Sequence, residues 1–231
     1  MSEQTQPKPS RSKPPQAEPP GPPPARPYRL QRRAEKQAAT RLRIVEAAIK
    51  LHGTIGPGRT TMSAIAQLAG VQRNTLYSYF PDESAVGQAC SSLWYERNPA
   101  PNINDLRAIP DPIDRLRATI QATHAYYAQT HQMLASLSRD MDLPYIQQAA
   151  APLFQQAAER RDTVVQAFRL RGARRTQLRA AVELALDFET WRTLIQRCGL
   201  PPAHAVDLLT RMVTALAPDS TASNSTAPRS S

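Results

Sequence analysis

The sequence predicts an all-α protein. Between about residues 30 and 217, apolar side chains recur at the three- and four-residue spacing of amphipathic helices. No stretch alternates apolar and polar residues as a half-exposed strand does. Glycine and proline interrupt the helical pattern at intervals, so the expected fold is a series of helices joined by loops.

Charge and cysteine content narrow the class of protein. The chain has 231 residues and a formal net charge of +10, which favours nucleic acid as a partner and, after it, an acidic membrane surface. Its two cysteines, Cys90 and Cys198, lie far apart and outside any metal-ligand spacing. No apolar run approaches the ~20 residues that span a bilayer, and the polar start is unlike a signal peptide. We therefore expect a cytoplasmic protein that is associated with the nucleoid when bound to DNA, with no membrane partner.

Residues 1–33 are predicted to form a disordered basic tail. Ten prolines and almost no large apolar side chains precede residue 28, so burial cannot offset the entropy of ordering. In one interpretation the segment is a solubilising tail. In the other, its lysines and arginines attract DNA phosphates without reading sequence.

A first ordered helix is predicted from about residue 30 to residue 51. Leu42, Val45 and Ala48 share one face of it. Thr40 is one candidate for its cap, but the preceding residues are also good helix formers and allow an earlier start. His52, directly after the helix, is interpreted as a half-buried core residue. This helix is expected to pack across the segment that follows and to complete a three-helix unit.

Residues 60–80 predict two short helices joined by a tight turn. A threonine at position 60 or 61 can cap the first helix, and Gly70 can end it by adopting a left-handed conformation. The second helix, over residues 72–79, directs Leu76 and Phe80 inward. This pattern is typical of a helix-turn-helix, whose second helix can enter the major groove of DNA.

Helix-breaking residues divide the remaining chain into further helices. Pro81 ends the second short helix, and a connecting helix is predicted over residues 82–97. A linker rich in proline and asparagine covers residues 98–112. Further helices are predicted over residues 113–131, 132–141, 145–171, 176–198 and 203–216, and residues 218–231 are predicted as a disordered tail.

The residues of the helix-turn-helix region resemble a known family. Residues 40–51, 59–66, 69–71 and 75–80, the last reading Thr-Leu-Tyr-Ser-Tyr-Phe, look like the DNA-binding domain of TetR-family transcriptional regulators. Residues 185–194, followed by Gly199 and Leu200, more weakly resemble the late helices of some members. The resemblance implies an N-terminal three-helix helix-turn-helix domain with its connecting helix (34–97) and a C-terminal helical ligand-binding and dimerisation domain (98–217).

The same resemblance implies a function. The expected protein is a homodimeric regulator, most simply a repressor, that a small-molecule effector of unknown identity releases from a palindromic double-stranded DNA operator. Two other classes stay open: a non-specific basic DNA-coating protein, and a helical sensor module without DNA binding. Asp82 and Glu83 favour the second alternative, because many family members carry a phosphate-contacting lysine near this position.

Candidate DNA-binding residues lie on the second short helix and at two helix starts. An arginine pairs with guanine and an asparagine with adenine, and a threonine at a helix start can offer its hydroxyl and N–H to phosphate. The candidates are Arg41, Thr60, Thr61, Gln72, Arg73, Asn74, Thr75, Tyr77 and Tyr79. The alternative for Tyr79 is a core side chain, and for Thr61 a helix cap alone.

Large and titratable side chains in the C-terminal half are candidates for an effector pocket, which family members enclose there. They are Trp94, His124, Tyr127, His131, Met133, Phe154, Phe168 and Trp191. For each, the alternative is an ordinary core side chain. His124 and His131 share a helix face, but no third ligand stands at a supporting spacing, so we expect no metal. No nucleophile motif or phosphate loop is present, and we expect neither a cofactor nor an enzyme.

The last two predicted helices carry broad apolar stripes, and in the family such helices pair with those of a second subunit. The candidate dimer-interface residues are Leu178, Val182, Leu186, Leu208, Leu209, Met212 and Leu216. Dimerisation places two recognition helices about 34–36 Å apart, which matches successive major grooves on one face of DNA.

Overall fold

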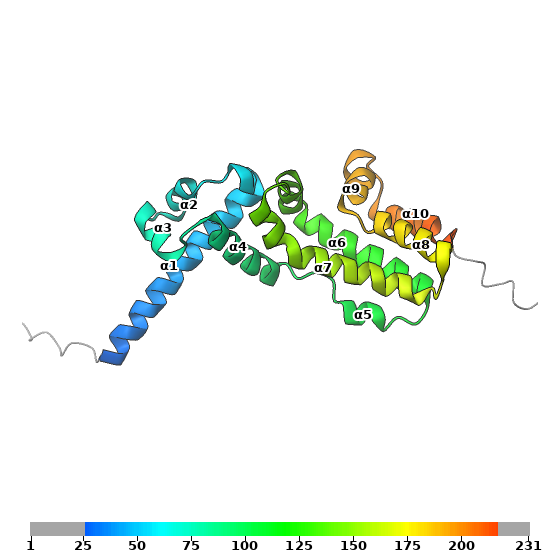
Figure 1. Cartoon of the computed structure of the whole chain (residues 1–231), viewed down its shortest axis with the longest axis horizontal. Coiled ribbons are helices and arrows are strands. Elements are labelled where there is room, and N and C mark those ends of the chain that lie inside the picture. Colours follow the sequence, from blue (N-terminus) through cyan, green and yellow to red (C-terminus); the bar gives the residue numbers. More distant parts are fainter. Residues whose placement is uncertain (1–25, 217–231) are drawn as a thin grey trace, which may run out of the picture. The chain divides into compact units, whose positions relative to one another are not determined.

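The structure, a computed structural model, describes residues 26–216 (Figure 1). Regular structure in this range is helical, with no strand among the described residues, and this confirms the all-α prediction. The predictions for residues 1–25 and 218–231 lie outside the described residues. Contacts divide the chain into two compact units, residues 1–39 and 40–231, which are described separately.

Helix α1 (Arg26–Thr54) begins earlier than expected. Residues 26–33, assigned to the tail from the sequence, are helical. Pro27 lies in the first turn, where its missing N–H has no intrahelical partner to lose, and residues 30–39 are mostly strong helix formers. In this first unit the Gln31 side chain donates a hydrogen bond of 3.1 Å to Glu35, one turn further along.

The second unit begins with the predicted helix-turn-helix region. A short 3-10 helix, η1 (Pro57–Arg59), leads into α2 (Met62–Ala69), α3 (Arg73–Tyr79) and α4 (Glu83–Arg97). These bounds agree with the predicted helices to within one residue. The three helices and the end of α1 enclose one apolar core, which includes Ile44, Val45, Ile65, Leu76, Phe80 and Val86.

The middle of the unit differs from the prediction in two places. Helix α6 (Pro112–Arg139) is continuous, so the predicted break between residues 131 and 132 is wrong. No glycine or proline lies between Pro112 and Pro144, and nothing in that stretch stops a helix. Within the predicted linker, Asn102 caps a short helix α5 (Ile103–Arg107) by accepting a bond of 3.0 Å from the Asn104 N–H.

The last helices also differ. Helix α7 (Pro144–Ala167) continues through Pro152 as predicted, but it ends before the predicted residue 171. The single helix predicted over residues 176–198 is wrong: α8 (Gly172–Ala185) is followed by α9 (Phe188–Trp191) and a π-helical segment, η2 (Arg192–Arg197). Asp187 starts α9 by accepting a bond of 3.0 Å from the Thr190 N–H, which interrupts the longer helix. Helix α10 (Pro202–Thr214) ends the described chain.

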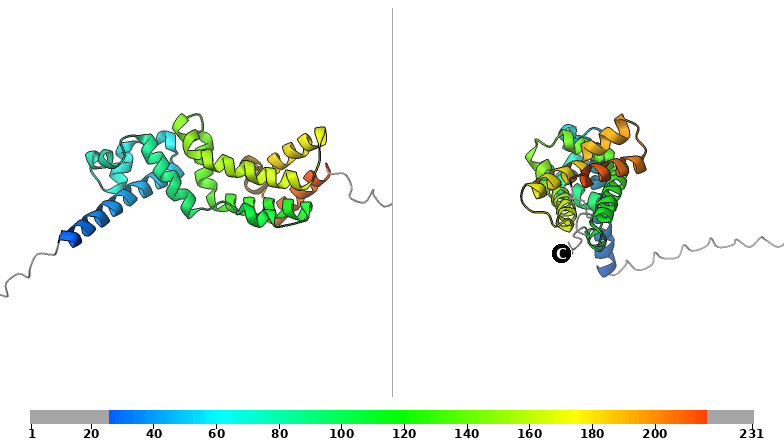
Figure 2. Two further views of the ribbon diagram at one scale, coloured as in Figure 1. Left: turned by 60° about the horizontal axis from the view of Figure 1, so that its bottom comes forward. Right: turned by 90° about the vertical axis from the view of Figure 1, so that its right-hand side faces the viewer.

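Helices α6 and α7 form an antiparallel pair, as Figures 1 and 2 show, and they organise the C-terminal bundle. Helix α10 packs on α6, α8 packs on α7 and α10, and α4 packs on α7. The bundle core includes Leu116, Ile120, Val164, Val165, Leu178 and Val182, all fully buried. Among residues 26–216, no helix is both long and apolar enough to cross a membrane.

Candidate functional site

The turn between α2 and α3 is fixed by capping at both ends of α2. The Thr61 hydroxyl oxygen accepts a bond of 3.1 Å from the Ala64 N–H, so Thr61, and not Thr60, is the cap. Gly70 adopts the left-handed conformation, with φ 65° and ψ 39°, as the sequence predicts. The Val71 N–H then donates to the Ala66 carbonyl at 3.0 Å, which closes the corner before α3 begins.

Helix α3 is anchored from one side only. Leu76 is fully buried and Phe80 is 2% exposed, and both belong to the core that α1, α2 and α4 share. On the opposite side, Arg73, Asn74 and Tyr77 are exposed. The predicted division of the helix into an inner and an outer face is therefore confirmed.

Two of the exposed residues contact each other. The Arg73 guanidinium carbon lies 5.5 Å from the centre of the Tyr77 ring, and Arg73 Nη2 donates a hydrogen bond of 3.3 Å to the Tyr77 hydroxyl. Both side chains lie one turn apart on the outer face. The contact orders a long, flexible arginine on the exposed face of α3.

The other candidate DNA-binding residues differ in accessibility. Gln72, Thr61 and Arg41 are exposed, and the Arg41 guanidinium stacks 5.1 Å above the Phe80 ring. Tyr79 is half-buried and packs against the core, which agrees with the alternative that it is a core side chain. Thr60 is buried and its hydroxyl donates to the Gly56 carbonyl at 2.8 Å, so Thr60 is removed from the candidate surface. Thr75 is half-buried at the edge of α3.

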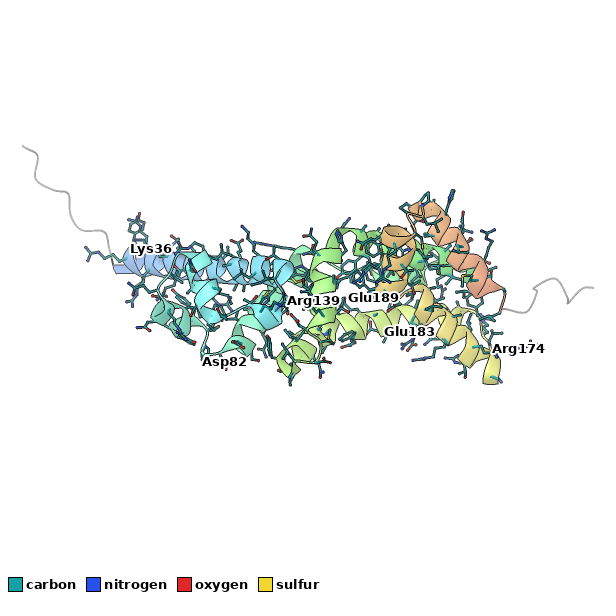
Figure 3. All side chains as sticks on the ribbon, turned by 90° about the horizontal axis from the view of Figure 1, so that it is seen from above. Lys36, Asp82, Arg139, Arg174, Glu183 and Glu189 are labelled. Atoms are coloured by element: carbon teal, nitrogen blue, oxygen red, sulfur yellow. The ribbon has the colours of Figure 1, made fainter. Side chains whose placement is uncertain are left out.

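Asp82 has a structural role at the start of α4. Its carboxylate accepts a bond of 2.8 Å from the Ala85 N–H, and it lies at the surface in Figure 3. An aspartate favours the positive end of a helix and is a strong cap. Asp82 is thus explained by the folding of α4, without reference to what this surface binds.

Helix α4 connects the two groups of helices within the second unit. The Tyr95 hydroxyl donates to the Ala149 carbonyl of α7 at 3.1 Å. The Arg97 guanidinium forms an ion pair of 2.6 Å with Glu46 of α1. Trp94 meets Tyr126 of α6 edge to face, with ring centroids 6.4 Å apart. A displacement of α6 or α7 would therefore also displace α4, the helix that follows α3.

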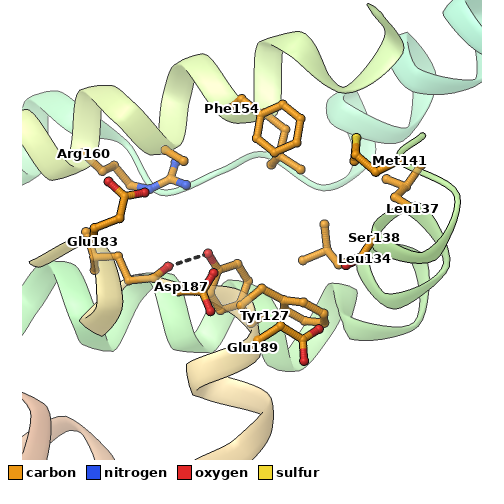
Figure 4. Close-up of a pocket in the computed structure, with 14 residues that line it drawn as sticks. Tyr127, Leu134, Leu137, Ser138, Met141, Phe154, Arg160, Glu183, Asp187 and Glu189 are labelled. Carbon is orange, nitrogen blue, oxygen red and sulfur yellow. Dashed lines mark hydrogen bonds between the residues drawn. The ribbon is translucent and has the colours of Figure 1, made fainter. Parts of the chain in front are cut away.

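The candidate effector site is a cavity of about 380 Å³ between α6, α7 and the segment where α8 leads into α9 (Figure 4). Tyr127 and Phe154 of the predicted pocket residues line it. We name it the Arg160 cavity, after the buried arginine of α7 in its wall. Its size falls at the lower end of the range for small-molecule sites.

The remaining pocket candidates lie elsewhere. Trp94, His131 and Met133 line a second cavity, which also borders α1, whereas His124 and Trp191 line a third beside α10. Phe168 packs against the C-terminal core. His124 and His131 thus face different cavities, and burial lowers the pKa of His124, which favours its neutral form. The predicted set does not form one site.

Arg160 is the residue that sequence reasoning missed. Only 2% of it is exposed, and burial lowers the pKa of its guanidinium. In the sequence Arg160 is adjacent to Arg161, and two adjacent arginines predict a solvent-exposed position for both. Its position four residues before the buried Val164, and seven after Leu153, places it on the inner face of α7, and this spacing is the signal that could have revealed it.

The predicted dimer-interface residues fall into two groups. Leu178, Val182, Leu186 and Leu209 are at most 8% exposed, because they pack inside the protomer's own core. They are therefore corrected to core residues. Met212 and Leu216 are exposed, at 50% and 41%, and Leu208 is half-buried. Leu184, which the sequence prediction omitted, is 54% exposed.

Comparison with known proteins agrees with the helix-turn-helix. The family model described as "Bacterial regulatory proteins, tetR family" matches residues 44–86. The HTH-type transcriptional regulator TtgR of Pseudomonas putida is 38% identical over 67 residues, which are 29% of this chain and 32% of TtgR. The chain thus matches about a third of the length of this curated relative.

Solved structures resemble the chain over most of its length. NalD, the secondary repressor of the MexAB-OprM multidrug efflux pump in Pseudomonas aeruginosa, has a TM-score of 0.56 at 18% identity, covering 78% of this chain and 96% of NalD. FadR from Bacillus subtilis, in complex with stearoyl-CoA, has a TM-score of 0.50 at 14% identity, covering 74% and 96%. At such identities the likeness shows the shared fold. The family model and TtgR both match the helix-turn-helix region, which therefore resembles the DNA-binding domain of bacterial regulatory proteins of the tetR family.

Proposed function

We propose that the chain is a DNA-binding transcriptional regulator that acts as a homodimeric repressor and leaves its operator when a small molecule binds. The observation that carries the proposal is the outer face of α3. It presents Arg73, Asn74 and Tyr77 to solvent on a helix whose other side is anchored in a buried core. Arginine and asparagine are side chains that read guanine and adenine in the major groove.

The related proteins support both halves of the proposal. NalD is described as a repressor, and the FadR structure contains a bound acyl-CoA. In this chain the Arg160 cavity offers space for a ligand within the C-terminal bundle. The proposal therefore assigns DNA binding to α3 and ligand binding to the bundle that α6 and α7 organise.

Dimerisation is proposed through exposed apolar residues of the last helices. Leu184 of α8 and Met212 of α10 are each at least half exposed, and Leu216 follows α10. Large apolar side chains that a protomer leaves exposed on adjoining helices are candidates for an interface, and α8 packs on α10. A two-fold related copy would provide the second recognition helix that a palindromic operator requires.

Helix α4 is the proposed link between ligand and DNA. It contacts α7 through Tyr95, α6 through Trp94 and α1 through Arg97. A ligand that separates α6 from α7 would tilt α4 and change the spacing of the two α3 helices. A differential affinity of about 1–3 kcal/mol between the two spacings is enough for a useful switch.

A mobility-shift assay on the DNA upstream of the chain's own gene tests the proposal. We expect saturable binding that unrelated DNA does not compete away at equal concentration. Arg73→Ala and Tyr77→Ala should abolish it while the dimer remains folded, and Arg174→Ala, an exposed arginine of α8 (Figure 3), should leave it unchanged. Equal competition by unrelated DNA would favour a DNA-coating protein, and no binding to any fragment would favour a sensor without DNA contact.

A further inference from the structure

We propose that the Arg160 cavity takes an amphipathic organic anion, with its acidic group at Arg160 and its apolar body along the opposite part of the cavity. The proposal rests on the function above in one respect, because it treats this cavity as the effector site. It goes further by naming the chemical class of the ligand.

The Arg160 charge is buried without a partner. Only 2% of the residue is exposed, and no ion pair or hydrogen bond joins its guanidinium to another of residues 26–216; the charge of the neighbouring Glu159 only partly opposes the lowering of its pKa by burial. Its neighbour Arg161 contrasts with it, since Arg161 forms ion pairs with Asp162 and Glu183. Removing a guanidinium from water is costly unless an anion pairs with it, so an anionic group entering the cavity would compensate this cost.

Three carboxylates also line the cavity, and they would favour a cation if they were free. Each is already engaged. Glu183 pairs with Arg161, and Glu189 pairs with Arg192 at 3.1 Å. Asp187 accepts the bond from the Thr190 N–H that starts α9. Among the residues lining the cavity, Arg160 is therefore the cation without an ion pair, whereas Glu183 and Glu189 are paired and Asp187 serves as a helix cap.

The cavity separates polar from apolar lining. Figure 4 shows Arg160 at one end, near Glu183, and Leu137 and Met141 at the other. Phe154 and Leu134 lie along the walls between the ends. A ligand with one acidic group and an apolar chain or ring system would match both ends, whereas a compact inorganic anion would leave the apolar end unfilled.

The Tyr127 hydroxyl in the wall of the cavity gives the ligand no competing donor. The Tyr127 hydroxyl donates a hydrogen bond of 2.7 Å to the Leu186 carbonyl, drawn as the dashed line in Figure 4. Burial raises the pKa of Tyr127 to about 12, so the group stays neutral. Arg160 is thus the group that would select for charge.

A matched series of probes tests the proposal on the full-length protein. 4-Phenylbutyrate, 4-phenylbutanol and 4-phenylbutylamine share one apolar body and differ in charge, and their affinities can be compared by calorimetry at pH 7. We expect the acid to bind at least about tenfold more tightly than the alcohol, because a charge-assisted bond to a buried arginine exceeds a neutral one. The amine should bind most weakly.

Two variants assign the preference to Arg160. Arg160→Gln should reduce the acid-to-alcohol ratio to about one, whereas Arg175→Gln, which removes an exposed arginine of α8, should leave it unchanged. Arg160→Met should lose the preference without lowering the melting temperature of the free protein, because it replaces an uncompensated buried charge. A lower melting temperature would indicate that the guanidinium is a structural group.

Other outcomes overturn the proposal. A preference for the amine would show that the three carboxylates dominate, and equal affinities, or binding of none of the probes, would exclude charge selection by Arg160. The repressor function is judged separately, by whether the unliganded protein binds its operator. Operator binding without acid selectivity would reject only this inference, and acid selectivity without operator binding would reject only the function.

Discussion

The Asp140 carboxylate accepts a hydrogen bond from the backbone N–H of Gly58, with 2.8 Å between Oδ2 and the nitrogen. Asp140 ends α6, and Gly58 lies in the short helix that leads into α2. A Cβ at Gly58 would lie 3.1 Å from the Asp140 carboxyl carbon, and one at Gly56 only 2.7 Å from Oδ2. Glycine at both positions allows this close approach between the cavity helices and the helix-turn-helix.

Removal of the Asp140 carboxylate should weaken the connection. We expect Asp140→Ala to lower the free energy of unfolding by about 1 kcal/mol, since the bond is charge-assisted but partly exposed to water. Asp140→Asn keeps an acceptor oxygen and should lose less. Urea denaturation of both variants measures the difference, and an equal loss in the two would show that the hydrogen bond contributes nothing.

A buried polar contact links α1 to α4. His52 Nδ1 lies 3.4 Å from Cys90 Sγ, and both residues are buried. Burial lowers the pKa of His52 to about 4, an effect that the charge of Asp140 partly opposes. Burial raises the pKa of Cys90 to about 12. Both side chains are therefore neutral at neutral pH, and His52 is a core residue.

His52 should make stability depend on pH. Its pKa falls from 6.5 in the unfolded chain to about 4 in the folded protein, so the unfolded state binds the extra proton first. The stability that neutral His52 allows is complete above pH 6.5 and is lost as pH falls from 6.5 to 4. His52→Phe should reduce the stability lost between pH 7.5 and 5.0 by about 2 kcal/mol.

Denaturant titrations at the two pH values measure this loss. A loss as large in His52→Phe as in the unsubstituted chain would contradict the assignment. Burial lowers the pKa of His124 too, so His124→Phe, which probes a different cavity, is the matched comparison.

The proposed dimer surface predicts different effects for the same substitution at two residues of α10. Met212 is half exposed and Leu209 is 3% exposed. Met212→Glu should give a folded monomer, because it places a charge where a partner would pack, whereas Leu209→Glu should unfold the chain by burying an unpaired carboxylate. Leu68→Glu makes the same change at an exposed leucine of α2 and should remain dimeric. Light scattering coupled to gel filtration measures the mass, and a dimeric Met212→Glu would exclude α10 from the interface.

The sequence predicted the helix-turn-helix well because its signals are local. Thr61, Gly70 and Pro81 act on residues within one helical turn, and the spacing of Leu76 and Phe80 fixes the inner face of α3. The break before Asp187 was missed for a different reason. An aspartate within an apolar helical pattern is ordinary, and only its bond to the Thr190 N–H makes it a cap.

The C-terminal site depends on how distant helices pack, which spacing alone does not determine. Leu178 and Met212 both lie on apolar stripes, yet one is fully buried inside the protomer and the other is half exposed. The stripe shows that a helix face is apolar and leaves open which neighbour covers it. Arg160 was missed because a charged residue is assigned to the surface unless its position on the helix face is weighed against its charge.

Thr61 allows a last prediction that separates a helix cap from a phosphate contact. Its hydroxyl oxygen caps α2, while its side chain is exposed beside the candidate DNA surface. Aspartate is an equally good cap and also suits the positive end of the helix, but its charge repels phosphate. Thr61→Asp should therefore keep the free energy of unfolding within about 0.5 kcal/mol of the original and yet weaken operator binding. Thr61→Ala removes the cap and should lower the free energy of unfolding by about 1 kcal/mol, but it adds no charge that repels phosphate. Paired measurements of urea denaturation and operator affinity distinguish the two roles: if Thr61→Asp binds the operator as tightly as the unsubstituted protein, Thr61 is a cap alone.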